Sequence, residues 1–317
     1  MSTEVDVEID GQYRAMKEGA GVLDRSSRGI MIVRGPDAAE FLQGQLTNDI
    51  EALEPGAGCY AALLDRKGHM QADMRVLRLS NGDLWLDTEP EALPTVERHL
   101  RMYSIGREVE VEDGSGEWTL LSVIGPAASE MSGAGPLSGE HSQREYSRDG
   151  VEIHAVATDL GVDLIARAGQ AAELKSLLAA TEAVDVTEAA TEILRVESGR
   201  PRFGREMTTA TIPQEAAIDD RAVSFTKGCY IGQETVARLH YKGKPNRHLR
   251  GLRLEGEVSN GDEIHLGDRA VGQVGTAVLS PAHGRIALAV VRREAEAGAH
   301  VEIGDAAVGA EVAEPPF

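Results

Sequence analysis

The C-terminal part of the chain has a different pattern of apolar residues and glycines from the rest, and this difference constrains the fold more than any other feature. From His248 onward, glycine turns separate short apolar runs at 249–254, 263–266, 270–278, 286–291 and 300–303. Short strands at this spacing are typical of a small antiparallel barrel. The sequence therefore predicts a separate C-terminal β-barrel domain over residues 247–317.

The preceding residues mix helices, strands and hairpins. Helical patterns occur at 12–20, 37–46, 93–100, 170–180 and 187–197, and strands are predicted at 29–34, 60–64, 70–79, 84–86, 109–111, 118–124, 151–156 and 162–166. Tight turns at 65–68 and at Asn81-Gly82 join neighbouring strands, and the stretch 132–142 is predicted as a loop. Hairpins among helices indicate an α+β fold rather than a doubly wound parallel sheet.

Length and composition describe a soluble protein of two or three domains. The chain has 317 residues, 42% of them hydrophobic, and a net charge of −20. It contains no apolar run long enough to span a membrane, and residues 1–10 are acidic rather than a basic secretory leader. We expect a cytoplasmic protein without membrane contact. Cys59 and Cys229 are too few for a disulfide framework or a four-thiolate site, so we expect reduced thiols and no metal.

One octapeptide places a cysteine in a chemically suggestive setting; it is Lys227-Gly228-Cys229-Tyr230-Ile231-Gly232-Gln233-Glu234. The pattern predicts that a helix begins here and that Cys229 lies in its first turn. The helix dipole and Lys227 would then both favour the thiolate. The alternative is a small buried residue, the commonest fate of a free cysteine. Both readings stay open at this point.

Two acidic residues are candidates for binding or proton transfer. Glu197 ends a predicted helix, and it either pairs with Arg200 or Arg202 or accepts two N–H donors from the amidine-like edge of a heterocycle. Asp73 lies in a predicted strand, where it either faces a cavity or is solvated.

A basic strip interrupts the otherwise acidic chain at 238–250, with the sequence RLHYKGKPNRHLR. It is either a solvated loop or a local attractor for an anion, such as a polyglutamate tail or an RNA phosphate. The net charge opposes nucleic-acid binding in general, and Tyr241 is the only aromatic residue of the strip. A ligand tail is therefore favoured over RNA.

Several separated blocks resemble one family. They are KGCYIGQE at 227–234, GPDA at 35–38 with FLQ at 41–43 and LTND at 46–49, LRVESG at 194–199 with IPQE at 212–215, and the ending Pro316-Phe317. In these blocks the chain resembles the YgfZ-type folate-binding proteins. These are linked to iron–sulfur cluster maintenance and are relatives of the glycine-cleavage T-protein, an aminomethyltransferase. The resemblance covers nearly the whole chain, and the octapeptide is its specific element.

The resemblance implies a fold and a ligand. The fold would be a three-domain cloverleaf around a central channel that holds tetrahydrofolate or a one-carbon derivative. Two interleaved α+β domains would form residues 1–246, with an approximate split near 50–115, and the barrel would follow at 247–317. Glu197 would contact the pterin ring, and the other cofactor-binding candidates are Arg200, Arg205, Gln233 and Arg238. Cys229 and Lys227 would serve the cluster-related role.

One departure separates the two relatives. T-proteins carry two adjacent aspartates after a Gly-Gly pair, whereas this chain has Gly68-His69-Met70-Gln71-Ala72-Asp73 and keeps only the second. Methylene transfer is weakened by this change, and Asp73 could still act near N10 of the folate. The first hypothesis is thus a folate-binding accessory protein for iron–sulfur cluster assembly or repair, with assembly factors or client enzymes as partners. The alternative is a tetrahydrofolate-dependent aminomethyltransferase or demethylase, and an RNA-associated factor ranks last.

Overall fold

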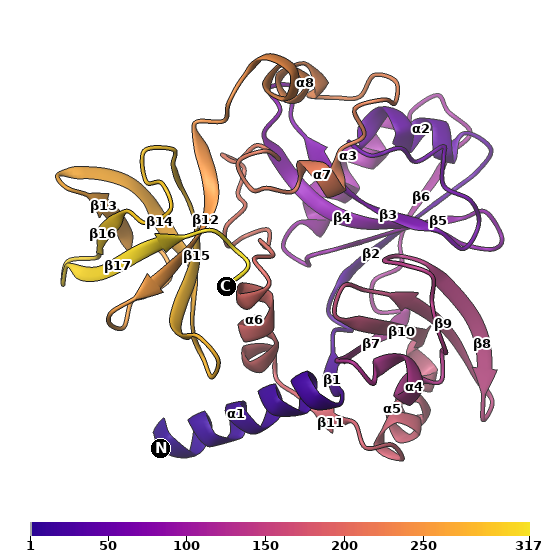
Figure 1. Cartoon of the computed structure of the whole chain (residues 1–317). Coiled ribbons are helices and arrows are strands. Elements are labelled where there is room, and N and C mark those ends of the chain that lie inside the picture. Colours follow the sequence, from indigo (N-terminus) through magenta and orange to yellow (C-terminus); the bar gives the residue numbers. More distant parts are fainter. Residues whose placement is uncertain (1) are drawn as a thin grey trace. The chain divides into compact units, whose positions relative to one another are not determined.

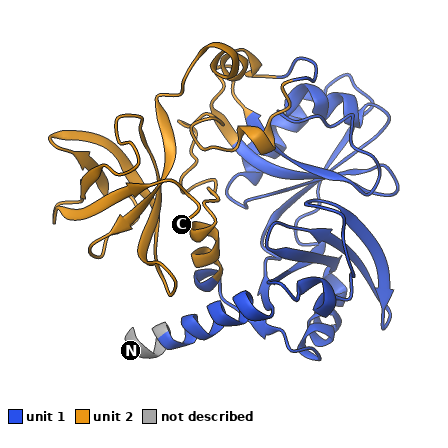
Figure 2. Ribbon diagram, in the orientation of Figure 1, with its two compact units in different colours: residues 1–63, 72–190, 226–230 blue, residues 64–71, 191–225, 231–317 orange. Residues whose placement is uncertain are grey.

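The structure is a computed structural model that describes residues 2–317, with side chains from Val7 onward. Two compact units divide the chain, as Figure 2 shows. The first contains the residues up to 63 together with 72–190 and 226–230. The second contains 64–71, 191–225 and 231–317. Each unit is therefore built from segments that are far apart in the sequence.

The first unit holds two sheets. One has the strand order β3 (Gly58–Leu64), β4 (Met70–Arg78), β5 (Leu84–Thr88), β2 (Gly29–Arg34) and β6 (Glu110–Asp113). The sequence between and after these strands forms α2 (Ala38–Gln45) and α3 (Leu93–Tyr103). Strand β5 pairs with β2 and β4 in antiparallel fashion. A cluster that includes Ile32, Leu77 and Trp85 joins this sheet to the second one through Leu120 and Ile165.

The second sheet of this unit has six strands. Their order is β11 (Val184–Asp185), β1 (Gly21–Asp24), β7 (Trp118–Ile124), β10 (Gly161–Arg167), β9 (Val151–Ala157) and β8 (Gln143–Arg148). The helical segments around it are α1 (Ser2–Glu18), α4 (Ala128–Ser132), η1 (Ala168–Gln170) and α5 (Ala171–Ala179). Leu174 and Leu178 of α5 pack into the core of the sheet, because their spacing of four residues puts both on one helix face.

The second unit contains the C-terminal barrel, labelled β12 to β17 in Figure 1. The closed order is β12 (Arg247–Leu254), β15 (Gly284–Arg292), β14 (Arg269–Ser280), β13 (Glu263–Leu266), β16 (His300–Ile303) and β17 (Val308–Ala313). Its helices are α6 (Glu188–Glu197), α7 (Asp219–Ala222) and α8 (Gln233–Lys242), with the first residues of α6 belonging to the first unit. Val196 of α6 packs against Leu249 and Leu288 of the barrel.

The structure confirms the predicted α+β class and the C-terminal antiparallel barrel. The strands β1, β8, β11 and β17 were not predicted. The edge strand β8 (QREYSR) has no buried side chain and so lacks the apolar alternation that marks a strand. No helix among the described residues is long and apolar enough to cross a membrane. The division into 1–246 and 247–317 stays a prediction about independent folding.

Candidate functional site

Asp73 lies on β4 of the first unit, where it meets Tyr60 of the neighbouring strand β3. The Tyr60 hydroxyl donates a hydrogen bond of 2.6 Å to Oδ2 of Asp73, and the side chain is half-buried. Burial raises the pKa of Asp73, and the charge of Glu89 acts in the same direction. The Tyr60 hydrogen bond and the charge of Arg28 oppose the shift. Asp73 therefore holds its proton to a higher pH than an ordinary aspartate.

A network of charged side chains continues from Glu89 across this unit. Arg28 pairs with Asp87 and, at 2.7 Å, with Glu89; Arg75 pairs with Asp87 and, at 2.7 Å, with Asp163. The side chains of Arg75, Asp87 and Asp163 are less than a tenth exposed. Burial alone would raise the pKa of Asp87, but the charges of Arg28 and Arg75 lower it. Asp87 is therefore firmly an anion.

Lys227 of the octapeptide is a half-buried cation with fixed partners. Its Nζ donates to the carbonyl oxygens of Gln43, Leu46 and Asn48 at 2.6, 2.7 and 2.7 Å. An ammonium group has three donors, so these three acceptors match it. Burial lowers the pKa of Lys227 to about 8, which leaves the group charged at neutral pH. Nζ also lies 5.1 Å from the ring centre of Tyr230.

The predicted position of Cys229 in the first turn of a helix is wrong. Helix α8 begins at Gln233, and its N-cap is Gly232 in the left-handed conformation with φ of 84°. No residue with a side chain fits at position 232, because a Cβ on Gly232 would lie 2.5 Å from the carbonyl oxygen of Asp65. The field of a helix terminus acts only within about one turn, so it does not account for a reactive thiol at Cys229.

The alternative of a buried cysteine is also wrong for Cys229, because its side chain is exposed. The three donors of Lys227 are directed at carbonyl groups, so the lysine does not serve to activate this thiol by hydrogen bonding. Cys59 on β3 is half-buried, and burial raises its pKa to about 12 despite the nearby charge of Lys227. The two thiols therefore differ: Cys59 is held protonated, and Cys229 is open to solvent. Among the described residues, no group of three or more histidine, cysteine, aspartate or glutamate side chains is placed to hold a metal.

Glu197 is the last residue of α6 in the second unit, as its helical pattern predicts. It is 7% exposed, and the Ser280 hydroxyl donates a hydrogen bond of 2.6 Å to its Oε1. Its backbone carbonyl accepts a hydrogen bond from the amide of Phe317 at 3.0 Å. Arg202 pairs with Glu192 at 3.3 Å. Glu197 thus presents a nearly buried carboxylate that is fixed from the barrel side.

The other predicted cofactor-binding residues also belong to the second unit. Arg200 is half-buried, and its backbone carbonyl accepts a hydrogen bond from the Arg195 guanidinium. Gln233 is the first residue of α8, and Arg238 is exposed on the same helix. The side chains of Arg205, Gln233 and Arg238 make no hydrogen bond or ion pair with any described residue. These three side chains are therefore available to a ligand.

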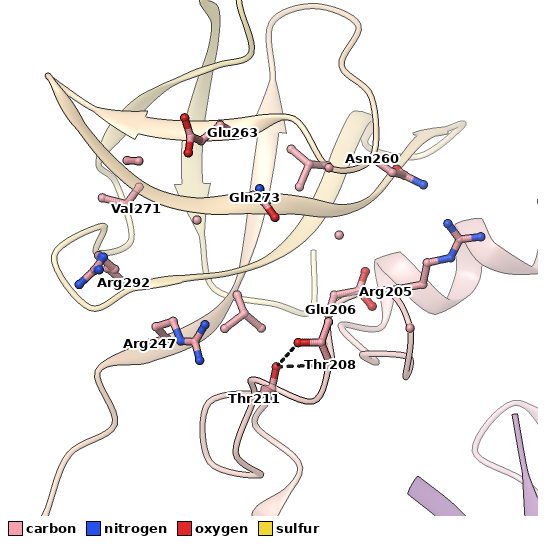
Figure 3. Close-up of a pocket in the computed structure, with 17 residues that line it drawn as sticks. Arg205, Glu206, Thr208, Thr211, Arg247, Asn260, Glu263, Val271, Gln273 and Arg292 are labelled. Carbon is pink, nitrogen blue, oxygen red and sulfur yellow. Dashed lines mark hydrogen bonds between the residues drawn. The ribbon is translucent and has the colours of Figure 1, made fainter. Parts of the chain in front are cut away.

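Arg205 lines a groove of about 530 Å³ against the barrel, shown in Figure 3. The groove is also lined by Arg247 and Arg292, but Arg247 pairs with Glu215 at 3.0 Å. Figure 3 shows the guanidinium groups of Arg205 and Arg292 far apart on opposite sides of the view, so they do not converge on one anion. Glu197 is not among the lining residues. The groove is therefore not the pterin site that the sequence predicts.

The predicted basic strip is interrupted in the structure. Arg247 pairs with Glu215, and Arg250 pairs with Glu314 at 3.2 Å. Acidic residues distant in the sequence thus neutralise its second half. Arg238, Lys242 and Lys244 are exposed and form no ion pair with a described residue. Only the first part of the strip therefore retains an uncompensated positive charge.

Sequence reasoning missed the partners of both acids. The predicted turn at 65–68 already places Tyr60 across the hairpin from Asp73, so this contact had a signal in the sequence. No signal in the sequence indicated the contact of Ser280 with Glu197, because the two residues lie 83 positions apart along the chain. Nor did the sequence indicate the ion pairs of Glu89 and Asp87.

Comparisons with known proteins match this architecture. Residues 3–227 match the model of the GCVT N-terminal domain, and residues 247–317 match that of the glycine cleavage T-protein C-terminal barrel domain. The chain belongs to the glycine-cleavage T-protein family. It is 30% identical to an aminomethyltransferase of Rubrobacter xylanophilus, over 98% of this chain and 86% of the relative. An uncharacterized protein of Haemophilus influenzae is 28% identical over 74% of each chain.

A solved structure confirms the predicted T-protein fold. The glycine cleavage system aminomethyltransferase T of Bartonella henselae superposes with a TM-score of 0.87 at 23% identity. The match covers 98% of this chain and 89% of that one.

Proposed function

We propose that this protein binds tetrahydrofolate and supports iron–sulfur cluster assembly or repair, with the thiol of Cys229 taking part. The family implies folate as the ligand, and the octapeptide at 227–234 suggests the cluster-related role. The relatives named as aminomethyltransferases are compatible with folate binding and leave the role of this chain to its own residues. Glu197 is the residue that carries the ligand part of the proposal.

The carboxylate of Glu197 suits the amidine-like edge of a pterin. A carboxylate has about four lone-pair sites, and the Ser280 hydroxyl occupies one of them on Oε1. A carboxylate can accept two parallel N–H donors from a planar heterocycle. Because the side chain is nearly buried, such charge-assisted hydrogen bonds are little weakened by water. Arg205 and Arg238, which have no partner among the described residues, are our candidates for the carboxylates of the glutamate tail.

The cluster-related part of the proposal depends on Cys229. It is the exposed member of the two cysteines, so a partner protein can reach its sulfur. Two cysteines supply too few thiolates for a cluster held by this chain alone, so any cluster would need ligands from a partner. Lys227 would act as a positioning residue, because its three hydrogen bonds fix the chain two residues before the thiol.

Calorimetric titration with tetrahydrofolate tests the ligand part. We expect the wild-type protein to bind and Glu197→Ala to bind roughly 10- to 100-fold more weakly, since hydrogen bonds to a charged group contribute about 1.5–3 kcal/mol. Glu311→Ala, which removes an exposed carboxylate of the same unit, is the matched control and should leave the affinity unchanged. Equal affinities of the wild type and Glu197→Ala would remove Glu197 from the site.

The hydrogen-bonded pair of Asp73 and Tyr60 favours a second candidate, a tetrahydrofolate-dependent aminomethyltransferase or demethylase. A carboxyl group whose pKa is raised by burial is suited to acid–base chemistry at a folate nitrogen. This candidate requires folate-dependent turnover of an aminomethyl-loaded lipoyl carrier, lost in Asp73→Asn. An absence of turnover by the wild type at saturating folate would exclude it.

A further inference from the structure

The groove beside the barrel has a floor that is one face of the barrel sheet. Gln273 of β14 is paired with Val290 of β15 and with Glu263 of β13, and directly opposite residues of a sheet share a face. Arg292 lies two residues from Val290 on the same face, and Arg247 of β12 is its cross-strand partner. All five residues line the groove, whose volume of about 530 Å³ is ordinary for a ligand site.

One end of this floor carries two guanidinium groups. Arg247 and Arg292 lie directly opposite each other, which is unfavourable for like charges unless anions compensate them. Glu215 compensates Arg247 through contacts of 3.1 and 3.0 Å. Arg292 is exposed and makes no hydrogen bond or ion pair with a described side chain, and the nearby Glu294 is held by Arg269 at 3.0 Å. This end of the groove therefore lacks one carboxylate.

The other end of the groove carries an acceptor without a donor. Glu206 lines the groove and is 4% exposed, and its Oε2 accepts hydrogen bonds from the Arg195 guanidinium and the Arg202 amide, both at 3.0 Å. Its Oε1 has no hydrogen-bond partner in the part of the chain that the structure describes. The carboxylate fills the space above Gly275, where a Cβ would lie 2.8 Å from Oε1. A ligand N–H group would stabilise this buried oxygen.

The distance between the two ends suits a short extended peptide. Val291, the neighbour of Arg292, is paired with Gly272, which lies three positions before Gly275 on β14. At 3.2–3.4 Å per residue, roughly 10 Å of strand separate the two ends, and about three extended residues span that length.

The middle of the groove offers a partner for a peptide group. Figure 3 shows Arg292, Gln273 and Glu206 in this order across the groove. The side-chain amide of Gln273 forms no hydrogen bond within residues 7–317, and it can both donate to and accept from a peptide unit. The Arg205 guanidinium lies beyond Glu206 in the same view, and its charge disfavours a free ammonium group there. A peptide that enters at this end is therefore continued by further chain.

We propose that the groove binds the carboxyl-terminal segment of a partner polypeptide. Arg292 binds the terminal carboxylate, Gln273 pairs with the next peptide group, and an N–H group about three residues from the end donates to Oε1 of Glu206. Capture of a terminal carboxylate together with main-chain groups is a recurring mode of peptide recognition. Every residue of the site belongs to the second unit, and the site does not require folate.

NMR titration of the nitrogen-15-labelled full chain with N-acetyl-trialanine tests the proposal, and the carboxamide of the same peptide is the matched probe. We expect saturable shifts of the Gly272 and Gly275 amides with the acid. We also expect an affinity for the carboxamide that is weaker by about fivefold or more, because it lacks the charge that Arg292 binds.

Two variants separate this contact from a general loss of structure. Arg292→Gln should bind the acid and the carboxamide equally, whereas Arg293→Gln, at an exposed arginine that does not line the groove, should keep the wild-type preference. Gly275→Ala displaces Glu206 and should weaken both probes.

Three results would overturn the proposal: no saturable shift, equal wild-type affinities for the acid and the carboxamide, or an unchanged preference in Arg292→Gln. Tighter binding of trialanine with a free amino group than of its N-acetyl form would also overturn it, because the groove would then hold free peptides rather than a chain end.

Discussion

Lys227 and Cys229 stand two residues apart in one motif, yet the structure gives them opposite surroundings. Lys227 is an ammonium group whose three donors bind the carbonyls of Gln43, Leu46 and Asn48. Cys229 is exposed to solvent. The octapeptide therefore has a structural half, which contains Lys227, and a chemical half, which contains Cys229. The structural half ties the motif to the segment 43–48.

The largest expected effect comes from removing the structural half. Lys227→Met leaves three carbonyl groups without their donor, and we expect the free energy of unfolding of this unit to fall by about 2–4 kcal/mol. Denaturant unfolding followed by circular dichroism measures the change. Lys67→Met, an exposed lysine, is the control and should stay within about 0.5 kcal/mol of the wild type. Equal unfolding midpoints for the two variants would contradict the structural role of Lys227.

A pH series sharpens the same comparison. Because burial lowers the pKa of Lys227 to about 8 from an ordinary 10.5, the unfolded chain binds more protons than the folded chain between these values. The contribution of this lysine to stability therefore rises with pH across this window and is constant below it. We expect the thermal midpoint of the wild type, measured relative to Lys227→Met, to increase from pH 8 to pH 10.5. A flat difference across that range would show that the lysine is not desolvated.

The smallest effect is expected at the chemical half. Cys229→Ala removes an exposed side chain, so the free energy of unfolding should change by less than about 0.5 kcal/mol. The same denaturant titration checks this value. A larger loss would mean that Cys229 packs into the protein and that the division of the motif into two halves is wrong.

The sequence predicted the parts of the fold that have a strong period. Apolar runs between glycine turns predicted five of the six barrel strands, all but β17, and the helix that ends at Glu197 has a clear apolar face. The strand β8 was not predicted because an edge strand needs no apolar face. The start of α8 was misplaced because Gly232, which adopts a left-handed conformation, was taken as an interior residue rather than the N-cap.

For the candidate site as well, some features could be predicted from the sequence and others could not. Asp73 and Glu197 could be proposed as individual residues, since a lone acid in a strand or at a helix end is visible in the sequence. Their surroundings were less accessible. The Ser280 hydroxyl reaches Glu197 only after the barrel has folded against α6, and the ion pairs of Glu89 and Asp163 join strands that are distant along the chain. Burial and charge balance, which set the chemistry of Asp73, are properties of the packed sheet.

Rescue of iron–sulfur enzyme activity in a strain that lacks this protein tests the central claim most directly. Wild-type protein and Cys59→Ala should both restore the activity of a cluster-dependent enzyme. Cys229→Ala should fail to restore it while binding tetrahydrofolate with the wild-type affinity. Full rescue by Cys229→Ala at equal protein levels would contradict the account.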